Sequence, residues 1–128
     1  MNPVIYFEIP VADLERAIAF YGAVFGPTFE RADVDGNAMA FFPYAPDRPG
    51  ASGALAQGDS YTPGHACARL YFTMQDIRAT PDKAVAAGGR VLYPPTLVDV
   101  FGEVAEIEDC EGNCVALQAP PLAADTAA

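Results

Sequence analysis

The stretch that decides the fold is Tyr6–Gly26, which reads YFEIPVADLERAIAFYGAVFG. It begins with the alternation of a half-buried strand and passes through Asp13, a typical helix N-cap. Apolar residues then follow at helical spacing and end at a glycine. A fainter copy, RLYFTMQDIRATPDKAVAAGG, occupies Arg69–Gly89, with Asp76 in the place of Asp13. We therefore predict two copies of one strand–helix unit.

Alternation and turn signals around this stretch predict the first module. They indicate a strand over Pro3–Val11, a helix from Asp13 to Gly26-Pro27, a hairpin of Thr28–Val34 and Ala38–Tyr44 about Asp35-Gly36-Asn37, and a short strand over Ala54–Gln57. In the first strand, Ile5, Phe7, Ile9 and Val11 should pack under the helix, and Tyr6, Glu8 and Pro10 should lie on the opposite face.

The second module repeats this order. Its predicted elements are a strand over Ala68–Met74, a helix starting near Thr80 with Pro81 in its first turn and stopping at Gly88-Gly89, a strand over Arg90–Tyr93, one or two strands within Val98–Asp109, a turn over Cys110–Asn113 and a last strand over Cys114–Ala119. Pro94-Pro95 should end the Arg90–Tyr93 strand, because proline has no N–H for the sheet.

Each module thus consists of a strand, a helix and three strands. We predict an α+β fold in which two paired βαβββ modules form a curved mixed sheet, with the helices outside. The face opposite the helix, which we call the cup face of each module, should line a cup. The predicted limits are one domain over residues 1–120, with modules at about 3–57 and 67–119, a linker over 58–66 and a flexible tail over 121–128.

Composition bounds the possible partners. The 17 acidic and 7 basic side chains give a formal charge of −10, which disfavours nucleic acid and would attract cationic ligands, or would simply confer solubility. No apolar run approaches the roughly 18–20 residues of a membrane span, so no membrane partner is expected. The first strand starts too near Met1 for a signal segment, which favours a cytoplasmic protein. Three cysteines do not suggest a disulfide framework.

The motifs together resemble the vicinal oxygen chelate superfamily, which holds glyoxalases, extradiol dioxygenases, fosfomycin-resistance enzymes and bleomycin-resistance proteins. The likeness lies in VADLERAIAFYGAVFG, the Gly88-Gly89 stop and DCEGNCVALQAP, whose Asp109–Asn113 part is similar to the family's turn before its final strand. It extends from about Val4 to Pro120. It implies the paired-module fold and a homodimer.

The superfamily's metal enzymes hold a divalent ion with His and Glu side chains and use it as a Lewis acid. The resemblance places the usual ligand positions at Tyr6, Arg69 and Ala116, with a fourth within Gly53–Gln57, where no carboxylate or imidazole occurs. A guanidinium would also oppose a bound cation. We therefore expect no metal and no other cofactor.

Glu8 and Arg69 are the charged candidates on the cup face. Glu8 could act as a general base, or it could form an ion pair with Arg69. Arg69 could equally bind a substrate carboxylate through its planar fork of donors. Both readings stay open from the sequence.

Aromatic and polar side chains complete the candidate ligand-binding set. Tyr6, Tyr71 and Tyr93 suit a small-molecule pocket but could also simply fill the cup, and Gln118 shares a strand face with Cys114 and Ala116. One of Phe41 and Phe42 must face the cup. His65 is expected to be a surface or hinge residue, and Glu106 and Glu108 to lie on a solvated edge.

Three functions fit these features. The first is a metal-independent, bleomycin-resistance-like protein that sequesters a small organic molecule, most simply a cationic one. The alternative is a glyoxalase-type lyase or isomerase with Glu8 as general base and Arg69 or Tyr6 stabilising negative charge. The third is a protein interaction module that has lost its pocket.

Overall fold

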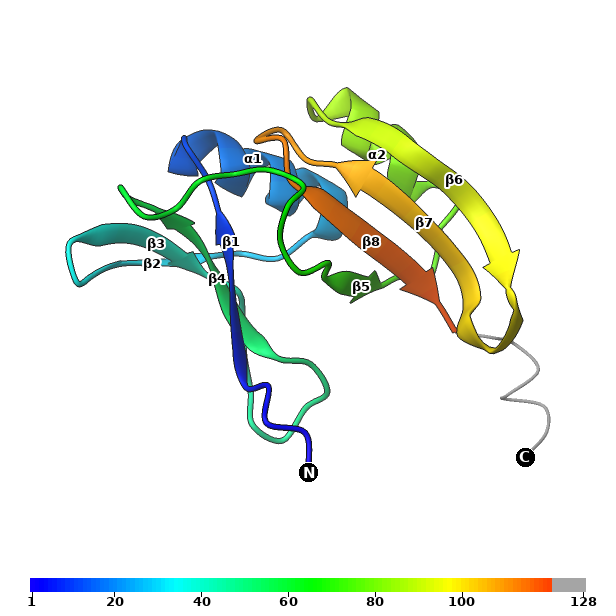
Figure 1. Cartoon of the computed structure of the whole chain (residues 1–128), viewed down its shortest axis with the longest axis horizontal. Helices are drawn as coiled ribbons and strands as arrows, with labels where there is room; N and C mark the ends of the chain where they lie inside the picture. Colours follow the sequence, from blue (N-terminus) through cyan, green and yellow to red (C-terminus); the bar gives the residue numbers. More distant parts are fainter. Residues whose placement is uncertain (121–128) are drawn as a thin grey trace. The chain divides into compact units, whose positions relative to one another are not determined.

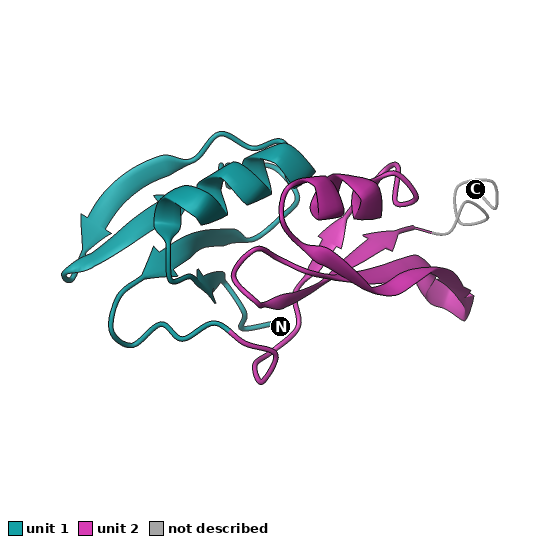
Figure 2. Ribbon diagram, turned by 90° about the horizontal axis from the view of Figure 1, so that it is seen from above, with its two compact units in different colours: residues 1–63 teal, residues 64–128 magenta. Residues whose placement is uncertain are grey.

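The computed structural model describes residues 1–120, and these divide into two units at Pro63–Gly64 (Figure 2). The division falls inside the predicted linker, whose limits remain a prediction, as do those of the modules. The predicted flexible tail, residues 121–128, lies outside the described residues. Each unit is described by itself below.

The first unit has the order strand, helix, three strands (Figure 1). Its elements are β1 (Tyr6–Pro10), α1 (Leu14–Phe25), β2 (Glu30–Val34), β3 (Asn37–Phe41) and β4 (Ser52–Gln57). They form one mixed sheet of order β1-β4-β3-β2, in which β1 runs parallel to β4 and the other neighbours are antiparallel.

The second unit repeats this topology. Its elements are β5 (Tyr71–Thr73), α2 (Thr80–Ala86), β6 (Arg90–Val98), a 3-10 turn (Asp99–Phe101), β7 (Gly102–Glu108) and β8 (Cys114–Ala119). The sheet order is β5-β8-β7-β6, again with only the first pair parallel. The predicted α+β fold of two βαβββ modules with mixed sheets is therefore confirmed.

Local signals in the sequence account for most element ends. Asp13 Oδ1 accepts a hydrogen bond from the Arg16 amide at 3.1 Å, and Gly26 closes α1 in the left-handed region, where an L side chain is strained. Asp35 and Gly36 both have positive φ, as a two-residue hairpin turn requires. The second helix starts at Thr80 with Pro81 in its first turn, as predicted.

Two strand predictions are corrected. The predicted break at Pro94-Pro95 is wrong, because β6 continues through both prolines to Val98. β6 is an edge strand of its sheet, and its pairing with β7 shifts register between Tyr93 and Thr96, so the missing N–H groups are tolerated there. The first strand begins at Tyr6 rather than Pro3, and Ile5 is 80% exposed instead of packing under the helix.

The core of the first unit lies between α1 and the sheet. Phe20 and Tyr21 of the helix are buried, as are Ile9 and Leu55 of the strands. Phe7, whose ring centroid lies 5.4 Å from that of Phe42, covers Gly53. In the second unit Ile107, Val115 and Leu117 are buried in the same way. Among the described residues, no helix has both the length and the apolar character needed to cross a bilayer.

Gly53 should not tolerate a side chain. A Cβ built there would lie 2.2 Å from the ring of Phe7, so Gly53→Ala must displace that ring and should cost about 1–3 kcal/mol of unfolding free energy. Urea unfolding measures the loss. Gly64→Ala is the matched control, because nothing lies within 4 Å of its Cβ. Equal stability of the two variants would contradict the close packing of Phe7 on Gly53.

Candidate functional site

The cup face of the first unit carries a carboxylate that accepts two phenol hydrogen bonds. The Tyr6 hydroxyl donates to Glu8 Oε2 at 2.9 Å, and the Tyr61 hydroxyl donates to Glu8 Oε1 at 2.6 Å. Tyr6 and Glu8 share this face, as their alternation in β1 predicts. Tyr61 was not expected at the site, because it lies in the polar segment that reads as a linker. An aromatic residue among small polar ones was the only signal.

The phenols are held in their neutral form. Burial raises the pKa of Tyr6 to about 12, with a further contribution from the hydrogen bond to Glu8. The hydrogen bond to Glu8 is the main cause that raises the pKa of Tyr61. Both hydroxyls therefore remain donors at neutral pH and keep the carboxylate of Glu8 oriented.

The structure decides which of the two phenylalanines faces the cup. Phe41 packs, together with Tyr61, on a cluster of Met39, Ala54 and Ala56 on the cup face. Phe42 points to the helix side, where its ring centroid lies 6.1 Å from that of Tyr21.

The corresponding face of the second unit holds the other predicted residues. Strand pairing places Tyr71, Ala116, Glu106 and Tyr93 in one row across the sheet. Arg69 Nη1 lies 2.7 Å from Glu106 Oε2, so Arg69 and Glu8 each have partners within their own unit. Gln118, two residues from Ala116, donates from Nε2 to the carbonyl of Phe101 at 2.8 Å.

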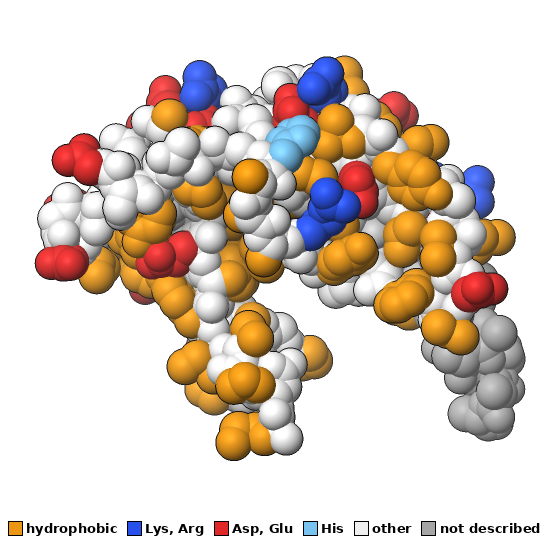
Figure 3. All heavy atoms as spheres, in the orientation of Figure 1, with side chains coloured by type: hydrophobic (Ala, Val, Ile, Leu, Met, Phe, Trp, Pro, Cys, Tyr) orange, Lys and Arg blue, Asp and Glu red, His pale blue; other side chains and the backbone are white. Residues whose placement is uncertain are grey.

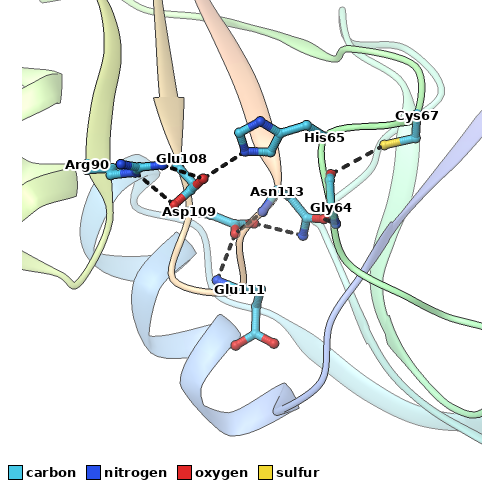
Figure 4. A network of polar contacts seen from close by, with 8 residues as sticks. All are labelled: Gly64, His65, Cys67, Arg90, Glu108, Asp109, Glu111 and Asn113. Atoms are coloured by element: carbon cyan, nitrogen blue, oxygen red, sulfur yellow. Dashed lines mark hydrogen bonds and ion pairs between the residues drawn. The ribbon is translucent and has the colours of Figure 1, made fainter.

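A second carboxylate of β7 links several parts of this unit (Figure 4). Glu108 accepts from Arg90 Nε at 3.0 Å and lies 2.7 Å from His65 Nε2. The expectation that Glu106 and Glu108 lie on a solvated edge is wrong, because β7 is an interior strand and both carboxylates are paired. The imidazole of His65 is partly exposed and visible in the space-filling view (Figure 3).

Hydrogen bonds within the Asp109–Asn113 turn explain why Asp and Asn stand at its two ends. Asp109 Oδ1 accepts from the amides of Glu111 and Asn113 at 2.8 and 2.9 Å, and its Oδ2 accepts from Asn113 Nδ2 at 3.0 Å. Asn113 Oδ1 in turn accepts from the Gly64 amide at 3.0 Å. These buried bonds fix the β7–β8 connection (Figure 4).

The positions that the resemblance assigns to metal ligands do not fit a divalent ion. They carry a neutral phenol at Tyr6, a guanidinium at Arg69 and a methyl group at Ala116. Ala54 is paired with Glu8 in the first unit, as Ala116 is paired with Tyr71 in the second. Ala54 is therefore the first unit's equivalent of Ala116. Within residues 1–120, no three His, Cys, Asp or Glu side chains are grouped to hold an ion. That the protein works without a metal stays a prediction.

A ligand-sized groove lies in the first unit. Its volume is about 590 Å³, and it lies where β2 begins, β3 ends and β4 begins. Its lining includes Phe29, Glu30, Phe41, Tyr44 and Ser52. It was not anticipated from the sequence, since it depends on how the Pro43–Ala51 loop leaves the sheet.

The fold and these motifs place the chain in a known family. The model of the Glyoxalase/Bleomycin resistance protein/Dioxygenase superfamily matches residues 4–117, and the chain belongs to that superfamily. No curated protein matches the chain.

Solved structures show the same fold. The chain has a TM-score of 0.73 and 18% identity to the fosfomycin resistance protein FosX from Listeria monocytogenes, covering 99% of this chain and 98% of that one. A glyoxalase I mutant from Zea mays matches with a TM-score of 0.68 and 21% identity, covering 91% of this chain but only 46% of the maize chain. TnmS3, an antibiotic binding protein from Streptomyces sp. CB03234, matches with a TM-score of 0.68 and 26% identity, covering 94% of this chain and 97% of that one.

The Glu108 pairing should make stability depend on pH. Hydrogen bonds from Arg90, and secondarily from His65, hold the pKa of Glu108 below its ordinary value of 4.5. Its contribution is therefore fully present above that pH and is lost as pH falls through the folded-state pKa. Glu108→Gln should lower the melting temperature by a few degrees at neutral pH and by progressively less in acid.

Thermal unfolding across this pH range checks the expectation. Asp47→Asn, an exposed substitution in the β3–β4 loop with the same change of charge, is the control and should show no such trend. A difference between Glu108→Gln and the unmodified protein that persists unchanged well below pH 4.5 would contradict the assignment.

Proposed function

We propose that this protein binds a small organic cation on the cup face of its first unit and sequesters it without converting it. The observation that carries the proposal is the Glu8 carboxylate, exposed on the sheet and oriented by the hydroxyls of Tyr6 and Tyr61. A fixed negative charge beside aromatic rings is a favourable environment for an organic cation. The formal charge of −10 favours the approach of such a ligand.

The same contacts argue against the enzymatic alternative. Each oxygen of Glu8 accepts one phenol hydrogen bond and keeps an acceptor site for a cationic donor. The Tyr6 hydroxyl donates to Glu8 and the Arg69 guanidinium donates to Glu106. Both anion-stabilising groups of the enzymatic alternative therefore already have a carboxylate partner. The likeness to an antibiotic binding protein supports binding as the function.

Benzamidine, a small aromatic cation, is a suitable probe. It should raise the melting temperature of the unmodified protein in a concentration-dependent way, since a ligand that binds only the folded state stabilises it. Glu8→Gln should remove this shift, because it removes the charge and keeps the shape. Asp59→Asn, which neutralises an exposed carboxylate of the same unit, should preserve it.

Three outcomes would overturn the proposal. A benzamidine shift that Glu8→Gln leaves intact would move the site away from Glu8. Shifts by small α-keto or α-hydroxy acids, with turnover that depends on Glu8, would favour the lyase or isomerase. Stoichiometric zinc, nickel or iron in the purified protein would contradict a metal-independent site.

We also propose, from the family resemblance, that the protein is a cytoplasmic homodimer. Sedimentation equilibrium should give twice the chain mass of 13.5 kDa. A single species at 13.5 kDa over the whole micromolar range would contradict the dimer. This result would leave the binding site of the first unit untouched, since all of its described contacts lie within residues 1–63.

A further inference from the structure

The groove of the first unit combines aromatic walls with a carboxylate. Its volume of about 590 Å³ falls in the range of small-molecule sites. Phe41 and Tyr44 supply flat apolar surface, Phe29 packs on Phe42 where the groove reaches the helix side, and Glu30 supplies the negative charge. Within residues 1–120 the Glu30 side chain has no ion-pair partner, and it is exposed. The groove is therefore suited to an aromatic ligand with a positive charge.

Strand pairing relates this groove to Glu8. Glu30 of β2 is paired with Phe41 of β3, Phe41 with Ala54 of β4, and Ala54 with Glu8 of β1. Paired residues of neighbouring strands project to the same face of a sheet. One row across the cup face thus carries a carboxylate at each end, with an aromatic ring and a methyl group between them.

The spacing of this row defines a length. Neighbouring strands lie about 4.8 Å apart, so the backbones of Glu30 and Glu8 are separated by three such steps, or roughly 14 Å. Ser52, which lines the groove, is paired with Tyr6, whose hydroxyl donates to Glu8. One lining residue of the groove therefore lies opposite Tyr6, the residue that orients Glu8.

The surface between the two carboxylates is apolar. Phe41 and Tyr61 pack on Met39, Ala54 and Ala56, and the Tyr61 hydroxyl reaches Glu8. Ala54 is fully buried and the rings of Phe41 and Tyr61 pack on it, so these rings form the surface in the middle of the row. A flat ring system could lie across this surface without meeting a charged group.

We propose that the groove and Glu8 together bind one elongated aromatic dication, with a cationic group at Glu30, a second at Glu8 and the flat part across Phe41. This inference rests on the proposed function and specifies its ligand class. Planar cationic groups such as amidinium match a carboxylate with two parallel hydrogen bonds. Arg48 lines the neighbouring hollow of about 230 Å³ beside Tyr44, which disfavours a cation on that side of the groove.

The probe for the test is DAPI, a flat aromatic diamidine whose fluorescence rises in an apolar site. Titration of nucleic-acid-free protein measures its dissociation constant. Glu30→Gln should weaken binding by about tenfold, the loss of one charge-assisted contact. Asp33→Asn is the matched control on the same strand: it changes the charge equally, lies outside the groove, and should change binding less than about twofold.

The monocation benzamidine separates this inference from the proposed function. If both hold, Glu8→Gln weakens the binding of both probes, whereas Glu30→Gln weakens the binding of DAPI more than that of benzamidine. If benzamidine depends on Glu8 but DAPI binds no better than benzamidine, or if Glu30→Gln and Asp33→Asn weaken DAPI equally, the dication inference is overturned and the proposed function stands. If Glu8→Gln affects neither probe, both are overturned.

Discussion

The parallel pairing of the first and last strand of each unit is the constraint on which the candidate site depends. β1 pairs with β4 across more than forty residues of chain, and the Val11 amide extends the pairing by donating to the Ala56 carbonyl at 2.9 Å. β5 pairs with β8 in the same way, and the Met74 amide donates to the Gln118 carbonyl at 2.9 Å. A shift of one residue in either register would move every side chain to the other face.

The two units have the same strand pairing but different side chains at equivalent positions of the cup face. The equivalent rows are Glu8, Ala54, Phe41 and Glu30 in the first unit, and Tyr71, Ala116, Glu106 and Tyr93 in the second. Alanine occupies the same place in both rows. In the first row a carboxylate stands at each end, with an aromatic ring beside the alanine. In the second row an aromatic ring stands at each end, with a carboxylate beside the alanine. Glu106 of the second row is paired with Arg69, whereas the carboxylates of the first row, Glu8 and Glu30, have no ion pair among the described residues.

Local patterns were sufficient for the fold and for the face of each candidate. The alternation in β1 predicted Tyr6 and Glu8 on one face because a strand has a period of two, and Asp13 and Gly26 fixed both ends of α1. The partners were not predictable. Tyr61 reaches Glu8 from a distant segment, and Arg69 reaches Glu106 across β8. Such contacts depend on register between strands, which a single sequence does not specify. The break predicted at Pro94-Pro95 was wrong for the same reason. The free-energy cost of proline's missing N–H depends on whether the strand lies at the edge of its sheet, as β6 does.

The residues at the positions that the resemblance assigns to metal ligands shape the cup face of each unit. Ala54 and Ala116 are both fully buried, so no side chain rises from these two central positions. Tyr6 adds a donor whose raised pKa, about 12, keeps it neutral, so it orients Glu8 without cancelling its charge. An oriented carboxylate beside an apolar surface binds a cation at little cost in conformational entropy. Both described side-chain partners of Glu8 are phenols that donate to it, so its negative charge stays at one fixed place on the face.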